Sequence, residues 1–338
     1  MRPMIPTLSA LALLVLTACG SDATTAMPAA SAASAASSTS AASASTTATP
    51  AASATSSTSA ASASTTATPA TTTTSAASAS TTTPESSATS TEAGLKAGSW
   101  ASGVTLTFSD GTVNYRSNGI PNHERQAEYA VPNGGVLVPD ATSATAIPDP
   151  TSEQSYDYNI PTTPTWSKTT TSASGGTIGV MISGAALFNP YEGDGTTVAT
   201  ASNFVVKDAA GNDVAFLDSC NGHPTPTGAY HYHGLPTCVT ATVDTDGGPS
   251  HLLGISFDGY PIYGDRALDG TKLTAADLDE CNGITSATPE FPEGIYHYVL
   301  LDTADSTSSI RCFHGVVDTS LMSMGGMGGM GGPPPASP

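Results

Sequence analysis

An internal repeat constrains the fold of this chain more than any other feature, because four landmarks occur twice in the same order. The landmarks of the first copy are GVMISGAALF (179–188), LDSCNG (217–222), GAYHY (228–232) and Cys238. Those of the second copy are GISFDGYPIY (254–263), LDECNG (278–283), GIYHY (294–298) and Cys312. The repeats span about residues 178–238 and 253–312, with unequal internal spacings. We therefore expect a diverged duplication rather than a tandem array.

Local patterns favour strands throughout this region. Residues 104–115 alternate around Asp110-Gly111, which predicts a hairpin, and the first landmark of each repeat alternates through a Ser-Gly or Asp-Gly pair in the same way. Helical periodicity is scarce; one short helix or turn is expected at residues 274–280, with Thr274 as its N-cap. The predicted fold is mainly β, a single β-sandwich-like domain built from the two repeats.

The N-terminus has the pattern of an export signal. Residues 1–18 combine Arg2 with a short apolar run that is too short to span a bilayer. The run ends in Leu16-Thr17-Ala18-Cys19, which resembles the lipobox of bacterial lipoproteins and implies that Cys19 carries a lipid. The alternative is a plain signal peptide followed by an unrelated thiol. The lipid would anchor an exported protein to a membrane, at the outer membrane or cell surface.

Two low-complexity segments flank the predicted domain, which we place at residues 93–321. Residues 19–92 consist almost entirely of Ala, Ser, Thr and Pro, a composition that buries too little apolar surface to fold and predicts a disordered stalk. Residues 322–338 form a Met-, Gly- and Pro-rich flexible tail. Thioethers suit Cu(I), but we favour low-complexity drift in a Gly-rich tail as the explanation of the methionines.

Charge and cysteine usage narrow the function classes. The chain has 9 Lys and Arg against 28 Asp and Glu, a net charge of −19, which repels phosphate backbones and argues against nucleic-acid binding. An even number of further cysteines in an exported protein predicts disulfides. The repeat favours Cys220–Cys238 and Cys281–Cys312, and the other two connectivities stay open at this stage.

The histidines suggest a metal site. In an extended strand His231 and His233 project from one face and Tyr230 and Tyr232 from the other. A disulfide from Cys220 to Cys238 would hold His223 near that strand. Imidazoles clustered in this way suit copper or zinc. The candidate ligands are His223, His231, His233, His297 and His314, with Asp218 and His251 as further completing groups.

The second repeat has Ile284, His297 and Val299 where the first has three histidines, so one half would keep a site and the other only the scaffold.

A second interpretation needs no metal. A repeated Tyr-His-Tyr is also what a buried hydrogen-bonded ladder would leave. Asp258, at a turn, is expected to accept backbone hydrogen bonds.

Four motifs together resemble the YHYH domain family of bacterial exported and surface proteins. They are SCNGH (219–223), GAYHYH (228–233), FDGYPIYG (257–264) and CFHG (312–315), and the resemblance covers roughly residues 100–315. The family commonly repeats a full Tyr-His-Tyr-His in its second half, where this chain ends in Val299. The resemblance implies export and specifies no reaction.

Two functions of different classes follow from these observations. The first is a surface-displayed metal-binding domain. The second is a non-enzymatic recognition module for glycans or neighbouring cell surfaces, with the aromatic turn at residues 260–263 as its contact area. The sequence does not decide whether the protein is an enzyme.

Overall fold

The computed structural model describes residues 88–132, 144–203 and 205–324. The predicted signal, the lipobox with Cys19, nearly all of the predicted stalk and the tail from residue 325 lie outside these residues. The first described element is helix α1 (Ala88–Ala97), whose first residues fall within the segment that the sequence assigned to the stalk. Among the described residues, no helix is both long and apolar enough to cross a membrane.

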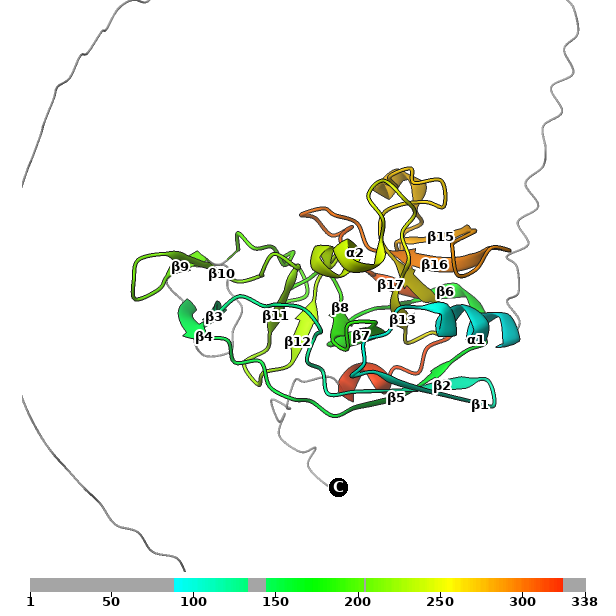
Figure 1. The fold of residues 1–338 in the computed structure, drawn as a ribbon, viewed down its shortest axis with the longest axis horizontal. Coiled ribbons are helices and arrows are strands. Elements are labelled where there is room, and N and C mark those ends of the chain that lie inside the picture. Colours follow the sequence, from blue (N-terminus) through cyan, green and yellow to red (C-terminus); the bar gives the residue numbers. More distant parts are fainter. Residues whose placement is uncertain (1–87, 133–143, 204, 325–338) are drawn as a thin grey trace, which may run out of the picture. The chain divides into compact units, whose positions relative to one another are not determined.

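One eight-stranded sheet contains both repeats, in the order β11-β12-β8-β7-β13-β14-β16-β15 (Figure 1). The first repeat supplies β7 (Thr177–Met181), β8 (Ala186–Phe188), β11 (Gly222–Pro224) and β12 (Tyr230–Tyr232). The second repeat supplies β13 (Leu252–Ser256), β14 (Pro261–Tyr263), β15 (Gly283–Ser286) and β16 (Ile295–Val299). Equivalent strands of the two repeats lie at the same distance from the centre of the sheet, between β7 and β13. The predicted duplication is thus seen in the strand order of the sheet.

The two halves meet at β7 and β13, which pair antiparallel with Ile255 opposite Val180. Glycine is required on both sides of this seam because the backbones approach closely. A Cβ on Gly254 would lie 2.3 Å from the carbonyl oxygen of Val180, and one on Gly179 would lie 2.9 Å from that of Ile255. Moving outward, each half continues with an antiparallel, a parallel and an antiparallel pairing.

A three-stranded sheet packs against the central one. It consists of β1 (Thr105–Ser109), β2 (Thr112–Ser117) and β5 (Tyr156–Pro161). The Tyr115 hydroxyl donates to the Met181 carbonyl at 3.1 Å, and the rings of Tyr158 and Phe257 lie 4.9 Å apart. The predicted β1–β2 hairpin is confirmed, with both turn residues, Asp110 and Gly111, at positive φ. The mainly β prediction is thus confirmed.

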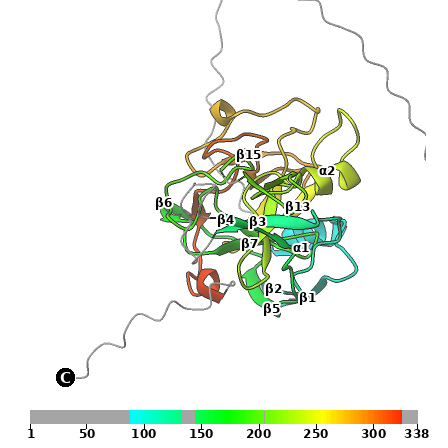
Figure 2. The same ribbon diagram turned by 90° about the vertical axis from the view of Figure 1, so that its left-hand side faces the viewer.

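Smaller elements complete the described part of the chain. The two-stranded sheets pair β3 (Glu128–Pro132) with β4 (Ala144–Pro148), β9 (Val205–Lys207) with β10 (Asp213–Ala215), and β6 (Trp166–Ser172) with β17 (Cys312–Gly315). The remaining helices of the described residues are α2 (Thr237–Val243) and the short 3-10 helices η3 (Ala275–Asp277) and η4 (Leu321–Met324). Thr274 caps η3 as predicted, whereas α1 and α2 were not predicted. In two views β1, β2 and β5 lie on one side of β7 and β13, and α2 on the other (Figure 1, Figure 2).

Candidate metal centre

Three histidines meet on the β11–β12 ribbon at the outer end of the first repeat. His223 of β11 lies directly opposite His231 of β12 in the antiparallel register, and His233 follows immediately after β12. The disulfide between Cys220 and Cys238, with its Cα atoms 5.2 Å apart, closes the loop that carries all three. The sequence predicted both this disulfide and the approach of His223, and both predictions are confirmed.

The three imidazoles present the same nitrogen to a common point. The Nε2 atom of His233 lies 3.1 Å from Nε2 of His231 and 3.2 Å from Nε2 of His223. Zinc–nitrogen bonds of 2.0–2.1 Å at tetrahedral angles would hold two ligand nitrogens about 3.3–3.4 Å apart. The spacing is therefore within a few tenths of an ångström of what one shared ion requires.

The opposite nitrogen of two of the rings is held by a backbone carbonyl. Nδ1 of His231 donates to Ala229 at 3.1 Å, and Nδ1 of His233 donates to Asn189 at 2.7 Å. The His223 ring has a hydrogen bond to the backbone of Pro224. A neutral imidazole carries one N–H, so the bonds of His231 and His233 assign the proton to Nδ1 and leave a lone pair on Nε2 of both rings. Backbone carbonyls are among the groups that orient metal-binding histidines in this manner.

Burial keeps these rings neutral. His223, His231 and His233 are 8%, 3% and 4% exposed. Loss of solvation lowers the pKa of His233 to about 4, and it lowers the pKa of His223 and His231 well below the usual value, with repulsion between the rings as a further cause. The Phe188 ring stacks on His231 at 3.8 Å, and the Phe216 ring lies 4.0 Å from His223. The cluster thus has apolar walls.

The remaining predicted ligands lie elsewhere. His297 occupies the position of His231 in the second repeat, donates from Nδ1 to the Ile295 carbonyl at 3.0 Å, and faces the Tyr263 ring. It has no imidazole partners, because Ile284 stands opposite it and Val299 follows. His314 of β17 lies 3.5 Å from a carboxylate oxygen of Asp279. Neither belongs to the cluster of His223, His231 and His233.

The suggested completing groups are also occupied. Asp218 accepts hydrogen bonds from the backbone of Cys220 and Gly222 and from the hydroxyls of Tyr129 and Tyr230. His251 pairs through Nδ1 with Glu290 at 2.8 Å. Asp258 accepts backbone and side-chain hydrogen bonds around its turn, as expected of a turn residue.

The face of β12 opposite the histidines holds its tyrosines, as the alternation predicted. The Tyr232 hydroxyl lies 2.7 Å from Nε2 of His123 and 2.9 Å from the Ser183 hydroxyl. His123, between β2 and β3, was not singled out from the sequence. No spacing pattern links it to the repeat, since it lies 97 residues before Cys220, the cysteine that it contacts.

The second disulfide joins Cys281 to Cys312, with Cα atoms 4.7 Å apart, so the symmetric connectivity is confirmed. Two disulfides indicate an extracytoplasmic protein. One expectation is wrong: Tyr260 and Tyr263 are 4% and 2% exposed, so the turn at residues 260–263 is not a contact surface. Both rings lie in or beside β14, at the buried centre of the second half.

A comparison with protein-family models agrees with this geometry. The model described as YHYH protein matches residues 157–273 and 269–315, which include both repeats and both disulfides. Residues 157–315 belong to the YHYH protein family. In this YHYH protein the tetrapeptide at residues 230–233 supplies two of the three clustered histidines from one face and the two tyrosines from the other. No curated protein and no solved structure matches the chain significantly.

Proposed function

We propose that this YHYH protein binds a transition-metal ion through Nε2 of His223, His231 and His233. The observation that carries the proposal is the set of Nε2–Nε2 separations of 3.1 and 3.2 Å between rings of which two, His231 and His233, have their Nδ1 atoms bonded to carbonyls. His231 and His233 therefore have no N–H left to place between their Nε2 atoms. Lone pairs that face each other in a buried site are stabilised by a cation between them.

The same reasoning weighs against a purely structural ladder of histidines. Between His231 and His233 a ladder needs a proton on one Nε2, and that proton would make its ring an imidazolium. Burial opposes the imidazolium, as the lowered pKa values of all three rings indicate. His297 of the second repeat differs from the clustered histidines. Its ring is equally buried and donates from Nδ1 to a carbonyl, but no imidazole faces its Nε2 atom.

Copper and zinc are the metals that we propose for this ligand set. Three neutral imidazoles suit both ions. No fourth His, Cys, Asp or Glu atom joins the cluster among residues 88–132, 144–203 and 205–324. A tetrahedral ion held by these three residues would keep one position for an exogenous ligand, which distinguishes a reactive from a closed structural site.

Metal analysis of the chain tests the proposal. The full protein, purified without chelators and titrated with Zn²⁺ and, separately, with copper, should bind one ion, and the His231→Ala/His233→Ala variant should bind none. His297→Ala is the matched control, since it removes the equivalent ring of the second repeat and should leave binding unchanged. A wild-type protein that binds neither metal at micromolar concentrations, with its fold intact, would falsify the proposal.

We also propose that the chain is a lipoprotein displayed from a membrane. The support is the segment Leu16-Thr17-Ala18-Cys19 after a short apolar run, together with two disulfides that suit an oxidising compartment. Metabolic labelling with a fatty acid should mark the wild-type chain and not the Cys19→Ser variant. Equal labelling of both would contradict the anchor.

A further inference from the structure

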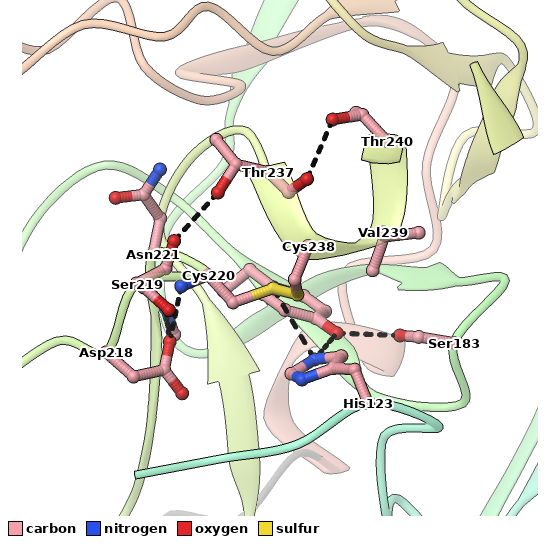
Figure 3. Close-up of a disulfide and its surroundings, with 12 residues drawn as sticks. His123, Ser183, Asp218, Ser219, Cys220, Asn221, Thr237, Cys238, Val239 and Thr240 are labelled. Carbon is pink, nitrogen blue, oxygen red and sulfur yellow. Dashed lines mark hydrogen bonds between the residues drawn. A yellow bond between two sulfur atoms is a disulfide. The ribbon is translucent and has the colours of Figure 1, made fainter. Parts of the chain in front are cut away.

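The disulfide of the first repeat has an imidazole directly beside it. Nε2 of His123 lies 3.5 Å from Sγ of Cys220, and Figure 3 shows the ring directed at the sulfur–sulfur bond. Nε2 of His123 and the sulfurs of Cys220 and Cys238 all lie within 4.8 Å of one another. Cys220 is buried, whereas Cys238 and His123 are half-buried. The group therefore has a side that is open to solvent.

The hydrogen bonds of His123 determine which of its nitrogens carries a lone pair. Nδ1 donates to the Glu124 carbonyl at 2.8 Å, so Nε2 is the acceptor and receives the hydroxyl proton of Tyr232. That hydroxyl has a second partner in Ser183, at 2.9 Å, to which it can donate instead. The Nε2 lone pair can thus be released without leaving the tyrosine unsatisfied.

We propose that reduction of the Cys220–Cys238 disulfide creates a second metal site, formed by the two thiolates and Nε2 of His123. A phosphine supplies the two electrons that break the sulfur–sulfur bond. It takes the oxygen of one water molecule and becomes the phosphine oxide, and the two hydrogens of that water complete the two thiols. A soft cation such as Zn²⁺, Cd²⁺ or Cu⁺ then displaces those protons and binds both sulfurs.

The spacing fits this ligand set. With zinc–sulfur bonds of about 2.3 Å and zinc–nitrogen bonds of about 2.0 Å, a tetrahedral ion holds its sulfur and nitrogen ligands about 3.5 Å apart. This equals the separation of Nε2 of His123 and Sγ of Cys220 in the oxidised protein. The two sulfurs must separate to about 3.8 Å, which side-chain rotation allows on Cα atoms 5.2 Å apart.

The second disulfide lacks the arrangement that this site requires. His314 lies near Cys281, and its Nε2 faces carboxylate oxygens of Asp279 at 3.5 Å and Glu280 at 3.3 Å. Only one sulfur of this pair belongs to that group, whereas both sulfurs of the first pair lie together with His123. The Cys281–Cys312 pair is therefore an internal comparison for the Cys220–Cys238 pair.

The new site shares no ligand with the three-histidine cluster. Tyr232, which contacts His123, projects from the opposite face of β12 to His231. The ligand classes differ as well, since one site is made of three nitrogens and the other of two sulfurs and one nitrogen. A spectroscopic signal from thiolate–metal bonds reports the second site alone.

Cadmium titration of the reduced full chain tests the proposal. Under anaerobic phosphine reduction, the wild-type chain and the Cys281→Ser/Cys312→Ser variant should develop a thiolate-to-cadmium charge-transfer band that saturates at one ion. The Cys220→Ser/Cys238→Ser variant, whose remaining thiols lack the imidazole of His123, should bind cadmium at least about tenfold more weakly, and the oxidised wild-type chain should show no such band. His123→Ala should weaken cadmium binding at least about tenfold. His231→Ala/His233→Ala should keep the band.

Three results would overturn the proposal. The first is a band that His123→Ala leaves unchanged in intensity and affinity. The second is the absence of a band in a reduced wild-type chain whose circular dichroism shows a retained fold. The third is a reduced chain that unfolds and that cadmium does not refold. The last two are decided by recording circular dichroism on the same samples.

Discussion

The two repeats of the central sheet share their strand order and register but differ in chemistry. His223, His231 and His233 of the first repeat correspond to Ile284, His297 and Val299 of the second. Both His231 and His297 donate from Nδ1 to the carbonyl two residues earlier, at 3.1 and 3.0 Å. Each repeat therefore has one strand histidine with the same bond to the backbone. Only in the first repeat do two further imidazoles, those of His223 and His233, lie beside that histidine and form the ligand cluster.

A second difference lies at the β-turns near the seam. In the first repeat the Tyr232 hydroxyl contacts Ser183 and His123. In the second repeat the equivalent Tyr298 donates to the buried carboxylate of Asp258 at 2.6 Å. The second repeat thus replaces a pair of neutral partners by one acid, which is also the acceptor for the backbone N–H of Gly315. The first repeat therefore carries the clustered histidines, and the second has a buried carboxylate that accepts hydrogen bonds from its own residues and from β17.

Introducing the two missing histidines into the second repeat should remove the chemical difference between the repeats and has the largest expected effect. Ile284→His and Val299→His should raise the metal content from one ion per chain to two, because Ile284 stands opposite His297 as His223 stands opposite His231. Placing a larger ring in a packed core costs about 1–3 kcal/mol, which is a tolerable loss. Metal analysis checks the result in wild-type and His231→Ala/His233→Ala backgrounds. Failure of the folded graft to bind any added metal would show that strand register alone does not make the site.

Removing each disulfide in turn sharpens the comparison. In the chain-entropy model, opening a loop of 18 residues costs about 3 kcal/mol and one of 31 residues about 4 kcal/mol, so both serine pairs should lower stability similarly. Only Cys220→Ser/Cys238→Ser should weaken metal binding by the three histidines, because its loop carries all of them. Denaturant unfolding and zinc titration measure the two effects. Equal zinc affinity in both variants would contradict the positional role of the first loop.

Acid should lower the stability of the folded chain through the buried His297. Burial lowers its pKa from 6.5 to about 4, so the unfolded chain binds a proton more readily than the folded chain between these values. Above pH 6.5 the ring is neutral in both the folded and the unfolded chain, so it does not change the free energy of unfolding with pH. As the pH falls from 6.5 toward 4, the free energy of unfolding decreases by about 3 kcal/mol at most. His297→Gln should remove that loss. Urea unfolding of both proteins from pH 7.5 to 4 checks it, and parallel stability curves would refute it.

The smallest expected effects concern the turn residues. Asp258→Asn should cost about 2–3 kcal/mol, because a buried charged acceptor of several hydrogen bonds is weakened. Ser183→Ala should cost about 1 kcal/mol or less, because the Tyr232 hydroxyl keeps its bond to His123. Thermal or denaturant unfolding ranks the two. An equal loss in both variants would mean that the turns are energetically equivalent despite their different residues.

Sequence alone predicted the parts of this molecule that repeat or alternate. The shared landmarks gave the strand equivalences and the disulfide pairing, and the period of two separated His231 and His233 from the tyrosines. His123 could not be found in this way, because its contact with Cys220 depends on a loop outside both repeats. The predicted exposure of Tyr260 failed for a related reason. An aromatic turn motif does not reveal that its strand lies inside an eight-stranded sheet.

The antiparallel seam between β7 and β13 has a consequence for how such a protein can be assembled. A chain with only one repeat would leave the glycine-lined edge of β7 without a partner, and an unpaired edge seeks another strand. A second copy of the same chain could fill it, because equivalent strands already pair across the seam in two-fold fashion. The present fold therefore has the two-fold arrangement of a homodimer within one polypeptide. Within a single chain the two halves can carry different residues at equivalent positions, as they do at the ligand positions.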